Sequence, residues 1–135
     1  MLRYMLDTNL CIRVLRDRPP GLRGRFSAEA GALCISTVTL AELLHGTARS
    51  ARPAEQRHEV ERLVGRLEVL PFDEDATGHY GEIRADLERR GTIIGPYDLM
   101  IAAHARSRGL IVVTENLGEF RRVDGLRSED WLTDA

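Results

Sequence analysis

The chain has 135 residues, which suits one domain, so we expect a single unit over residues 1–135. With 43% hydrophobic and 30% charged residues, its composition is that of a folded globular protein rather than a disordered one. No apolar run reaches the roughly 20 residues that a membrane helix needs, and an acid stands at position 7, where a signal peptide would be apolar. We therefore expect a cytoplasmic protein without membrane contact.

All 19 basic residues are arginine, because the chain contains no lysine. That excludes a standard phosphate-binding P-loop, a Schiff-base enzyme and a phosphatase with a catalytic lysine. The formal net charge of −2 also differs from the basic excess of a protein that coats nucleic acid. If a protein of this composition handles nucleic acid, it needs a local source of positive charge, which a bound metal ion would supply.

Short apolar runs alternate with amphipathic segments along the chain. In chain order the pattern predicts a strand at 4–6, helices at 9–16 and 21–29, a strand at 32–35, helices at 38–49 and 53–66, a strand at 68–70, helices at 73–90 and 96–108, a strand at 110–113 and a short tail strand near 126–127. Such an order is typical of a parallel sheet covered on both faces. The predicted fold class is α/β, a three-layer α/β/α domain with a central, mainly parallel, short-stranded sheet.

The cysteines and histidines show no pattern of a soft-metal site. Cys11 and Cys34 lie far apart and form no CxxC pair, so we expect two buried, ordinary thiols. The four histidines share no spacing typical of zinc ligands. His104 lies on an apolar helix, where we expect a core or interface residue.

Oxygen-bearing side chains follow the predicted strands, at the edge where an open parallel sheet binds its ligands. Five of them come from four separate segments: Asp7, Glu42, Asp98, Asn116 and Glu119. Clustered carboxylates repel one another, raise each other's pKa values and destabilise the fold, so they need a compensating cation. Mg²⁺ prefers oxygen ligands and stabilises the charge that develops on a phosphate during hydrolysis. The cluster therefore points to phosphodiester hydrolysis.

The first two acids also have a purely structural interpretation. Asp7 could cap the helix that follows it. Glu42 stands three residues after Thr39, as in a capping box. Ser36 or Thr37 is an equally good cap, however, and would leave Glu42 inside its helix.

The later acids have structural alternatives as well. Asp98 suits the positive end of its helix dipole, but that helix is apolar almost all round. A carboxylate on a buried face needs an arginine, a proton or a metal ion beside it. Glu119 precedes Phe120-Arg121-Arg122, where a solvated surface role is an alternative.

Four stretches in order carry a family resemblance: residues 5–9 (MLDTN), 36–43 (STVTLAEL), 94–105 (IGPYDLMIAAHA) and 113–120 (VTENLGEF). Residues 122–126 and 129–131 extend the match nearly to the end of the chain. Together they resemble the PIN-domain ribonucleases, and most of all the VapC toxins of bacterial VapBC toxin–antitoxin pairs. The resemblance implies a PIN-like fold for the whole chain.

The resemblance also implies a Mg²⁺ or Mn²⁺ site built on Asp7, Glu42 and Asp98. A fourth position of the family maps to Asn116, with Glu119 near enough to serve instead. Asn116 is neutral, which departs from a set of four acids. It stays open which of the two completes the site, and whether one metal ion binds or two.

The resemblance assigns supporting roles around these acids. Thr114 is expected near the site as a hydrogen-bonding hydroxyl, and Asn9 is expected to help orient Asp7. Glu119 joins the three acids as a catalytic candidate, while Asn116 joins them as a metal ligand. Four arginines are candidates for the RNA-binding rim: Arg13, Arg16, Arg121 and Arg122.

The implied activity is endonucleolytic cleavage of structured RNA. The subgroup that the chain most resembles cuts initiator tRNA in its anticodon region. A VapB-type antitoxin is the implied partner, with a C-terminal peptide that masks the site. Toxin homodimers and larger toxin–antitoxin assemblies are also implied, with operator DNA bound through the antitoxin.

Two other classes compete with this interpretation. A non-catalytic binding protein with a degenerate PIN fold is suggested by the neutral Asn116. A haloacid-dehalogenase-like phosphatase needs an acid two residues after its nucleophilic Asp and a lysine, but Asn9 follows Asp7 and lysine is absent. Cleavage of RNA in the presence of Mg²⁺ or Mn²⁺ separates the ribonuclease from both.

Overall fold

The computed structural model describes residues 1–132, and its elements alternate between strands and helices as the sequence predicts. In chain order they are β1 (Tyr4–Leu6), α1 (Thr8–Arg16), α2 (Leu22–Ala28), β2 (Leu33–Ser36), α3 (Thr37–Ala48), α4 (Pro53–Val64), β3 (Glu68–Leu70), α5 (Glu74–Arg90), α6 (Pro96–Arg108), β4 (Ile111–Val113), α7 (Leu117–Phe120) and β5 (Ser128–Glu129). The predicted α/β fold class is confirmed.

The strands form one sheet in the order β3-β2-β1-β4-β5, and every pairing is parallel. The chain first builds outward from β1 through β2 to β3, then crosses back to place β4 on the other side of β1. The direction of winding therefore reverses at β1, between β2 and β4. In open parallel sheets the ligand crevice lies at such a switch point, beyond the carboxyl ends of the strands.

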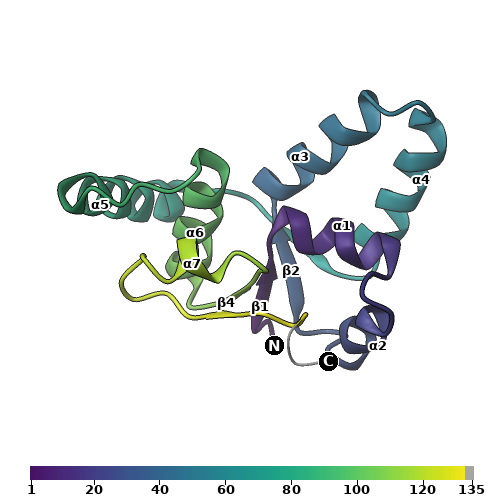
Figure 1. Cartoon of the computed structure of the whole chain (residues 1–135), viewed down its shortest axis with the longest axis horizontal. Helices are drawn as coiled ribbons and strands as arrows, with labels where there is room; N and C mark the ends of the chain where they lie inside the picture. Colours follow the sequence, from purple (N-terminus) through teal and green to yellow (C-terminus); the bar gives the residue numbers. More distant parts are fainter. Residues whose placement is uncertain (133–135) are drawn as a thin grey trace.

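Alternate residues of the central strands feed two separate cores, as the two-residue period of a strand requires. Met5 and Cys34 point into a core shared with α5, α6 and α7. Leu6 and Ile35 point to the other face, against α1, α2, α3 and α4. Figure 1 shows these two helical layers on either side of the sheet, with α6 beside the sheet and α5 projecting away from it. The three-layer arrangement leaves the upper sheet edge open between the layers.

Local capping fixes where the helices that carry the site begin and end. The Asp7 carboxylate accepts a 2.9 Å hydrogen bond from the Leu10 amide and caps α1. Ser36 caps α3 by accepting a 3.1 Å hydrogen bond from the Val38 amide. Gly109, with a φ of 66°, ends α6 in the left-handed conformation that favours glycine. Capping by Ser36 leaves Glu42 in the helix interior, which rules out its capping-box interpretation.

Two predictions near the C-terminal end need correction. The tail strand lies at Ser128–Glu129, two residues later than predicted, because its pairing with β4 sets the register Val112↔Ser128 and Val113↔Glu129. The helix α7 was missed, because four residues are too few to show a helical period. The other predicted elements begin and end within two residues of those in the structure.

The expectations for cysteine and histidine hold. Cys11 and Cys34 are free and buried, and burial raises the pKa of the Cys34 thiol to about 12. His104 is fully buried, and its Nδ1 lies 2.8 Å from the Ser36 hydroxyl, so it links α6 to the start of α3. Among the described residues its Nε2 has no hydrogen-bond partner, and burial lowers the pKa of the ring. None of the helices within residues 1–132 has the length and apolar character to span a membrane.

Candidate active site

Asp7 lies at the centre of the open edge, directly after β1, and is only 3% exposed. Burial raises its pKa from 3.8 to about 6. Hydrogen bonds from Thr114 and from the Leu10 amide partly oppose that shift, whereas the negative charges of Glu115 and Glu42 add to it. A buried carboxylate that stays next to other acids despite this cost is typical of a functional site.

Glu42 reaches the same edge from the interior of α3. Its carboxylate accepts a 2.5 Å hydrogen bond from the Thr8 hydroxyl, which itself lies 3.4 Å from the Thr39 hydroxyl. Thr8 is the first residue of α1, so this bond joins the helix that begins at Asp7 to the helix that carries Glu42. The contact holds Glu42 beside the β1 end of the site.

Asp98, Asn116 and Glu119 form a bonded group on the α6 side. The Asn116 amide donates to Glu119 at 2.6 Å and to Asp98 at 3.4 Å, and the Gly95 amide donates to Glu119 at 3.2 Å. Burial, a shared hydrogen bond with Glu119 and the charge of Asp7 raise the pKa of Asp98 to about 7. The hydrogen bond with Asp98 lowers the pKa of Glu119. The neutral Asn116 thus has a defined role here, because its amide bridges two acids.

The structure brings these residues to one edge without closing them into a cage. The charge of Glu42 raises the pKa of Asp7, and the charge of Asp7 raises the pKa of Asp98, so the three acids act on one another. Over residues 1–132, however, no three Asp, Glu, His or Cys side chains converge closely enough to form a preformed metal cluster. The hydrogen bonds explain this, since Glu42 is engaged by Thr8, and Asp98 by Asn116 and Glu119.

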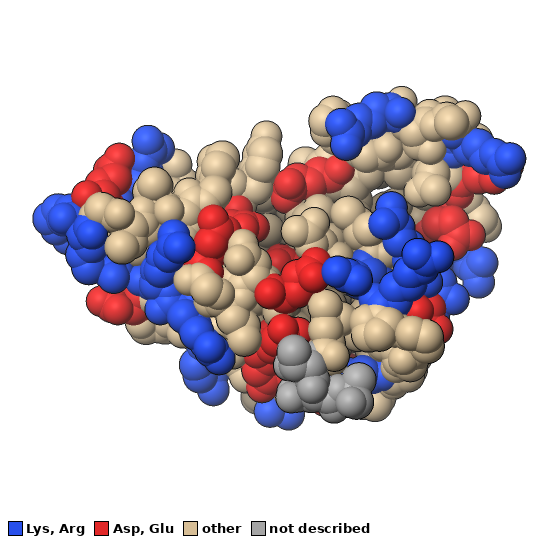
Figure 2. All heavy atoms as spheres, in the orientation of Figure 1, with Lys and Arg blue, Asp and Glu red and all other residues tan. Residues whose placement is uncertain are grey.

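In the described part of the chain, no arginine neutralises the three central acids by a hydrogen bond or an ion pair. Arg13 instead grips Glu115, with 2.9 and 3.4 Å bonds, and Arg122 donates to the Ile93 carbonyl at 3.1 Å. Figure 2 shows acidic side chains gathered at the centre of this face, with basic ones over α1 and α4 on one side and over α5 on the other. A hard divalent cation fits the donor set, because carboxylate and amide oxygens are the ligands that Mg²⁺ and Mn²⁺ prefer.

One expected supporting role falls to other residues. Asn9 is exposed in the first turn of α1, and no hydrogen bond between its side chain and Asp7 exists within residues 1–132. Asp7 is oriented instead by the Leu10 amide and by Thr114. Thr114 is therefore where it was expected, fully buried at the end of β4.

Two neighbours of the site were not singled out from the sequence. Thr8 holds Glu42, and Glu115 both adds negative charge beside Asp7 and binds Arg13. A usable signal existed for each, because Thr8 directly follows the first acid and Glu115 directly follows Thr114 at a neighbouring strand end. The Thr8–Glu42 bond spans 34 residues of sequence, so its partner could not be read from local pattern.

Comparison with known proteins places the chain in a family. The model of the PIN domain matches residues 4–126. The tRNA(fMet)-specific endonuclease VapC of Shigella flexneri is 51% identical over 131 residues, which cover 97% of this chain and 99% of the relative. Ribonuclease VapC2 of Haemophilus influenzae is 45% identical over 132 residues, which cover 98% of this chain and 100% of the relative.

Solved structures agree with the sequence relatives. The crystal structure of DNA-bound VapBC from Salmonella typhimurium contains a chain that is 51% identical, with a TM-score of 0.93, over 97% of this chain and 99% of that one. In VapBC2 from Rickettsia felis, bound to a DNA fragment from its promoter, a chain is 35% identical with a TM-score of 0.91, over 96% and 99%. The chain described here therefore belongs to the PIN-domain family and, within it, to the VapC-type ribonucleases.

Proposed function

We propose that this chain is a divalent-metal-dependent endoribonuclease toxin that cuts initiator tRNA and is inhibited by a VapB-type antitoxin. One observation carries the proposal: acids from three separate elements meet at the switch point of the sheet, and in the described residues no arginine compensates their charge. Burial is the largest cause of the raised pKa values of Asp7 and Asp98, and the negative charges of the neighbouring acids add to it. This negative charge favours a divalent cation.

Asp7, Glu42 and Asp98 would hold the ion, with Asn116 as a further oxygen ligand. When bound, Mg²⁺ or Mn²⁺ supplies the positive charge that polarises the phosphoryl oxygen and favours ionisation of the attacking water. Glu119 is a further carboxylate beside Asp98, and its contacts with Asn116 and the Gly95 amide fix its orientation. We assign Glu119 to positioning Asp98 and Asn116 and to completing the negative charge of the site.

The neighbouring hydroxyls keep the acids in place while the substrate enters. Thr114 orients Asp7, and Thr8 holds Glu42. Asp7 is buried at the base of the site, whereas Glu42, Asp98 and Glu119 are half-buried around it. A single-stranded loop suits this arrangement, because its splayed backbone can bring one phosphate down to a recessed carboxylate.

The substrate and partners are proposed from the relatives. The Shigella flexneri relative is named for tRNA(fMet), and the similar Salmonella typhimurium structure is a DNA-bound VapBC complex. We infer that this chain cuts tRNA(fMet) in its anticodon region, forms a homodimer, and joins larger assemblies with its antitoxin. Contact with operator DNA then comes through the antitoxin, which agrees with the mild acidity of this chain.

The substrate is tested by cleavage of initiator tRNA beside the elongator methionine tRNA. The proposal predicts cuts in the initiator tRNA alone, in Mg²⁺ or Mn²⁺, that vanish with EDTA and with Glu42→Gln. Equal cutting of both tRNAs would refute the substrate but keep the ribonuclease. Cleavage that persists in EDTA would refute the metal site.

A further inference from the structure

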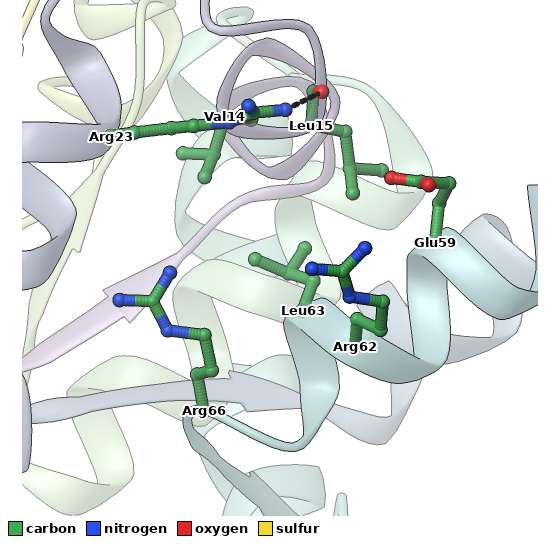
Figure 3. Close-up of a pocket in the computed structure, with 7 residues that line it drawn as sticks. All are labelled: Val14, Leu15, Arg23, Glu59, Arg62, Leu63 and Arg66. Carbon is green, nitrogen blue, oxygen red and sulfur yellow. Dashed lines mark hydrogen bonds between the residues drawn. The ribbon is translucent and has the colours of Figure 1, made fainter.

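A polar cavity of about 200 Å³ lies where α1, α2 and α4 meet. Its charged lining consists of Arg23, Arg62, Arg66 and Glu59, so cations exceed anions by two. Figure 3 shows the three arginines around a common space, with Leu63 between Arg62 and Arg66. None of the acids of the candidate active site lines this cavity, which we call the arginine cavity.

Arg23 is held in place by the end of α1. Its Nε donates a 3.0 Å hydrogen bond to the Val14 carbonyl, and its Nη2 donates to the Leu15 carbonyl. These carbonyls belong to the last turn of α1, where carbonyl groups lack i+4 helical partners, and the Val14 carbonyl also accepts from the Asp17 amide at 3.1 Å. The guanidinium is therefore fixed on one side, and Nη1 makes no hydrogen bond to any described residue.

Arg66 is also oriented before any ligand binds. Its Nη2 donates to the Ser27 hydroxyl at 2.8 Å, and its guanidinium carbon lies 4.9 Å from the centre of the Phe26 ring. Arg62 lies one helical turn earlier and lines the same cavity. Within residues 1–132 its guanidinium forms neither a hydrogen bond nor an ion pair. The cavity thus combines two oriented cations with one that is uncommitted.

A neighbouring cavity lies between the arginine cavity and Glu42 of the acidic site. This second cavity, of about 310 Å³, shares Leu15 and Glu59 with the first and is also lined by Glu42. Two more arginines line it, Arg16 and Arg49. Figure 2 shows the surface hollowed between α1 and the α3–α4 pair. The two cavities are therefore neighbours, and the arginine cavity lies next to the one that Glu42 lines.

We propose that the arginine cavity binds a backbone phosphate of the substrate RNA, on one side of the bond that is cut. This inference rests on the proposed ribonuclease activity and adds the path of the strand. Arginine presents planar, permanently charged N–H groups that match a phosphate in two-point contacts. A volume of about 200 Å³ is large enough for one phosphate with its water.

Charge gives the second reason for an RNA ligand. The chain carries a net charge of −2, and its site is acidic, so an RNA strand is repelled where it must react. A cation-rich cavity beside the one that Glu42 lines supplies attraction without neutralising the acids. Phosphate contacts of this kind fix the register of a strand without reading its sequence.

The test compares RNA binding by the double variant Arg62→Gln/Arg66→Gln with that by Arg57→Gln. Arg57 lies on the exposed side of the same helix and pairs with Glu61 at 3.1 Å, so it is a matched control. The double variant, Arg57→Gln and the parent protein with which both are compared also carry Asp98→Asn, which prevents cleavage during the titration. The probe is fluorescently labelled initiator tRNA in EDTA, titrated at several salt concentrations.

We expect the double variant to bind about tenfold or more weakly, with a salt dependence reduced by about one for each lost phosphate contact. Arg57→Gln keeps the affinity and the salt dependence of the parent protein. With Asp98 restored, the double variant cuts a short oligonucleotide that spans only the cleavage site at the wild-type rate. A general folding defect would lower that rate too.

Unchanged tRNA affinity and salt dependence in the double variant would overturn the inference. Weaker inhibition by an antitoxin peptide with unchanged tRNA binding would overturn it in favour of an acidic protein segment. If the wild-type chain cuts no RNA but binding still depends on both arginines, the ribonuclease proposal fails while the phosphate site stands. If cleavage occurs and the arginines do not matter, only the inference fails.

Discussion

Replacing Asp7 with Asn separates the catalytic value of this carboxylate from its cost to the fold. The pKa of Asp7 rises from 3.8 to about 6 on folding, because the side chain is buried. A shift of this size corresponds to about 3 kcal/mol between the two charge states. Because the pKa of Asp7 is higher in the folded state, protonation of this side chain favours folding. Its stabilising contribution is complete below pH 3.8 and is lost as the pH rises through about 6.

Asn caps a helix about as well as Asp, so the bond to the Leu10 amide survives in Asp7→Asn. We therefore expect the metal-free variant to be more stable than wild type by about 3 kcal/mol at pH 7.5. In a domain of this size that raises the melting temperature by about 10 °C. RNA cleavage is lost at the same time, because an amide does not replace the buried charge as a metal ligand.

The assay is thermal unfolding of both proteins in EDTA from pH 4 to pH 8, followed by a titration with Mg²⁺. The stability difference should be near zero at pH 4 and grow through pH 6, and Mg²⁺ should stabilise wild type but not the variant. A difference that does not change with pH, or a variant that is less stable at every pH, would refute the reasoning.

Three further predictions follow from other contacts. Glu119→Gln should lower activity and Mn²⁺ affinity about 10- to 100-fold, and more than Asn116→Ala does, because it removes a charge that supports Asp98; a larger loss in Asn116→Ala, measured by cleavage rate and calorimetry, would contradict that order. His104→Gln should lower the free energy of unfolding by about 1–3 kcal/mol at pH 7.5. Its deficit in denaturant unfolding should shrink below pH 6.5, because burial lowers the pKa of the native ring and protonation destabilises wild type alone; a deficit that grows on acidification would contradict this. Trp131→Ala should lower the free energy of unfolding by about 3–5 kcal/mol, because Trp131 is 2% exposed and its ring centre lies 5.3 Å from that of Tyr4. A loss under 1 kcal/mol in urea unfolding would show that Trp131 is not part of the core.

The edge location of the site followed from chain order alone. Short apolar strands separated by helices require a parallel sheet, and parallel strands deliver their carboxyl ends to one edge. Asp7 and Thr114 are therefore brought together by the β1–β4 pairing, in which Leu6 lies opposite Val113. The sequence also indicated that the Asp98 carboxylate needs an arginine, a proton or a metal ion beside it, because its helix is apolar and the chain has no lysine.

The contacts inside the site were beyond local pattern. Asn116 bridges Asp98 and Glu119 across α6 and α7, and α7 is too short to predict. Thr8 binds Glu42 across 34 residues, which depends on the angle between α1 and α3. The family resemblance implied that Asn9 orients Asp7, but the helix that starts at Thr8 turns Asn9 to the surface.

The arginine cavity shows the same limit on a larger scale. Its three cations come from α2, α4 and the turn after α4, so only the packing of those segments on α1 brings them together. The sequence indicated that an acidic nuclease needs local positive charge but could not place it. Of the expected rim residues, Arg13 binds Glu115, whereas Arg16 lines the same cavity as Glu42.

The central claim is that Asp7, Glu42 and Asp98 form a metal centre that hydrolyses RNA. It is tested most directly by incubating antitoxin-free protein with total bacterial RNA and Mg²⁺, and mapping the 5′ ends of the products. Parallel reactions contain Asp98→Asn protein or EDTA. We expect discrete cuts in initiator tRNA that disappear in both parallel reactions. Folded, Mg²⁺-loaded protein that cuts no RNA, or Asp98→Asn protein that cuts as well as wild type, would contradict it.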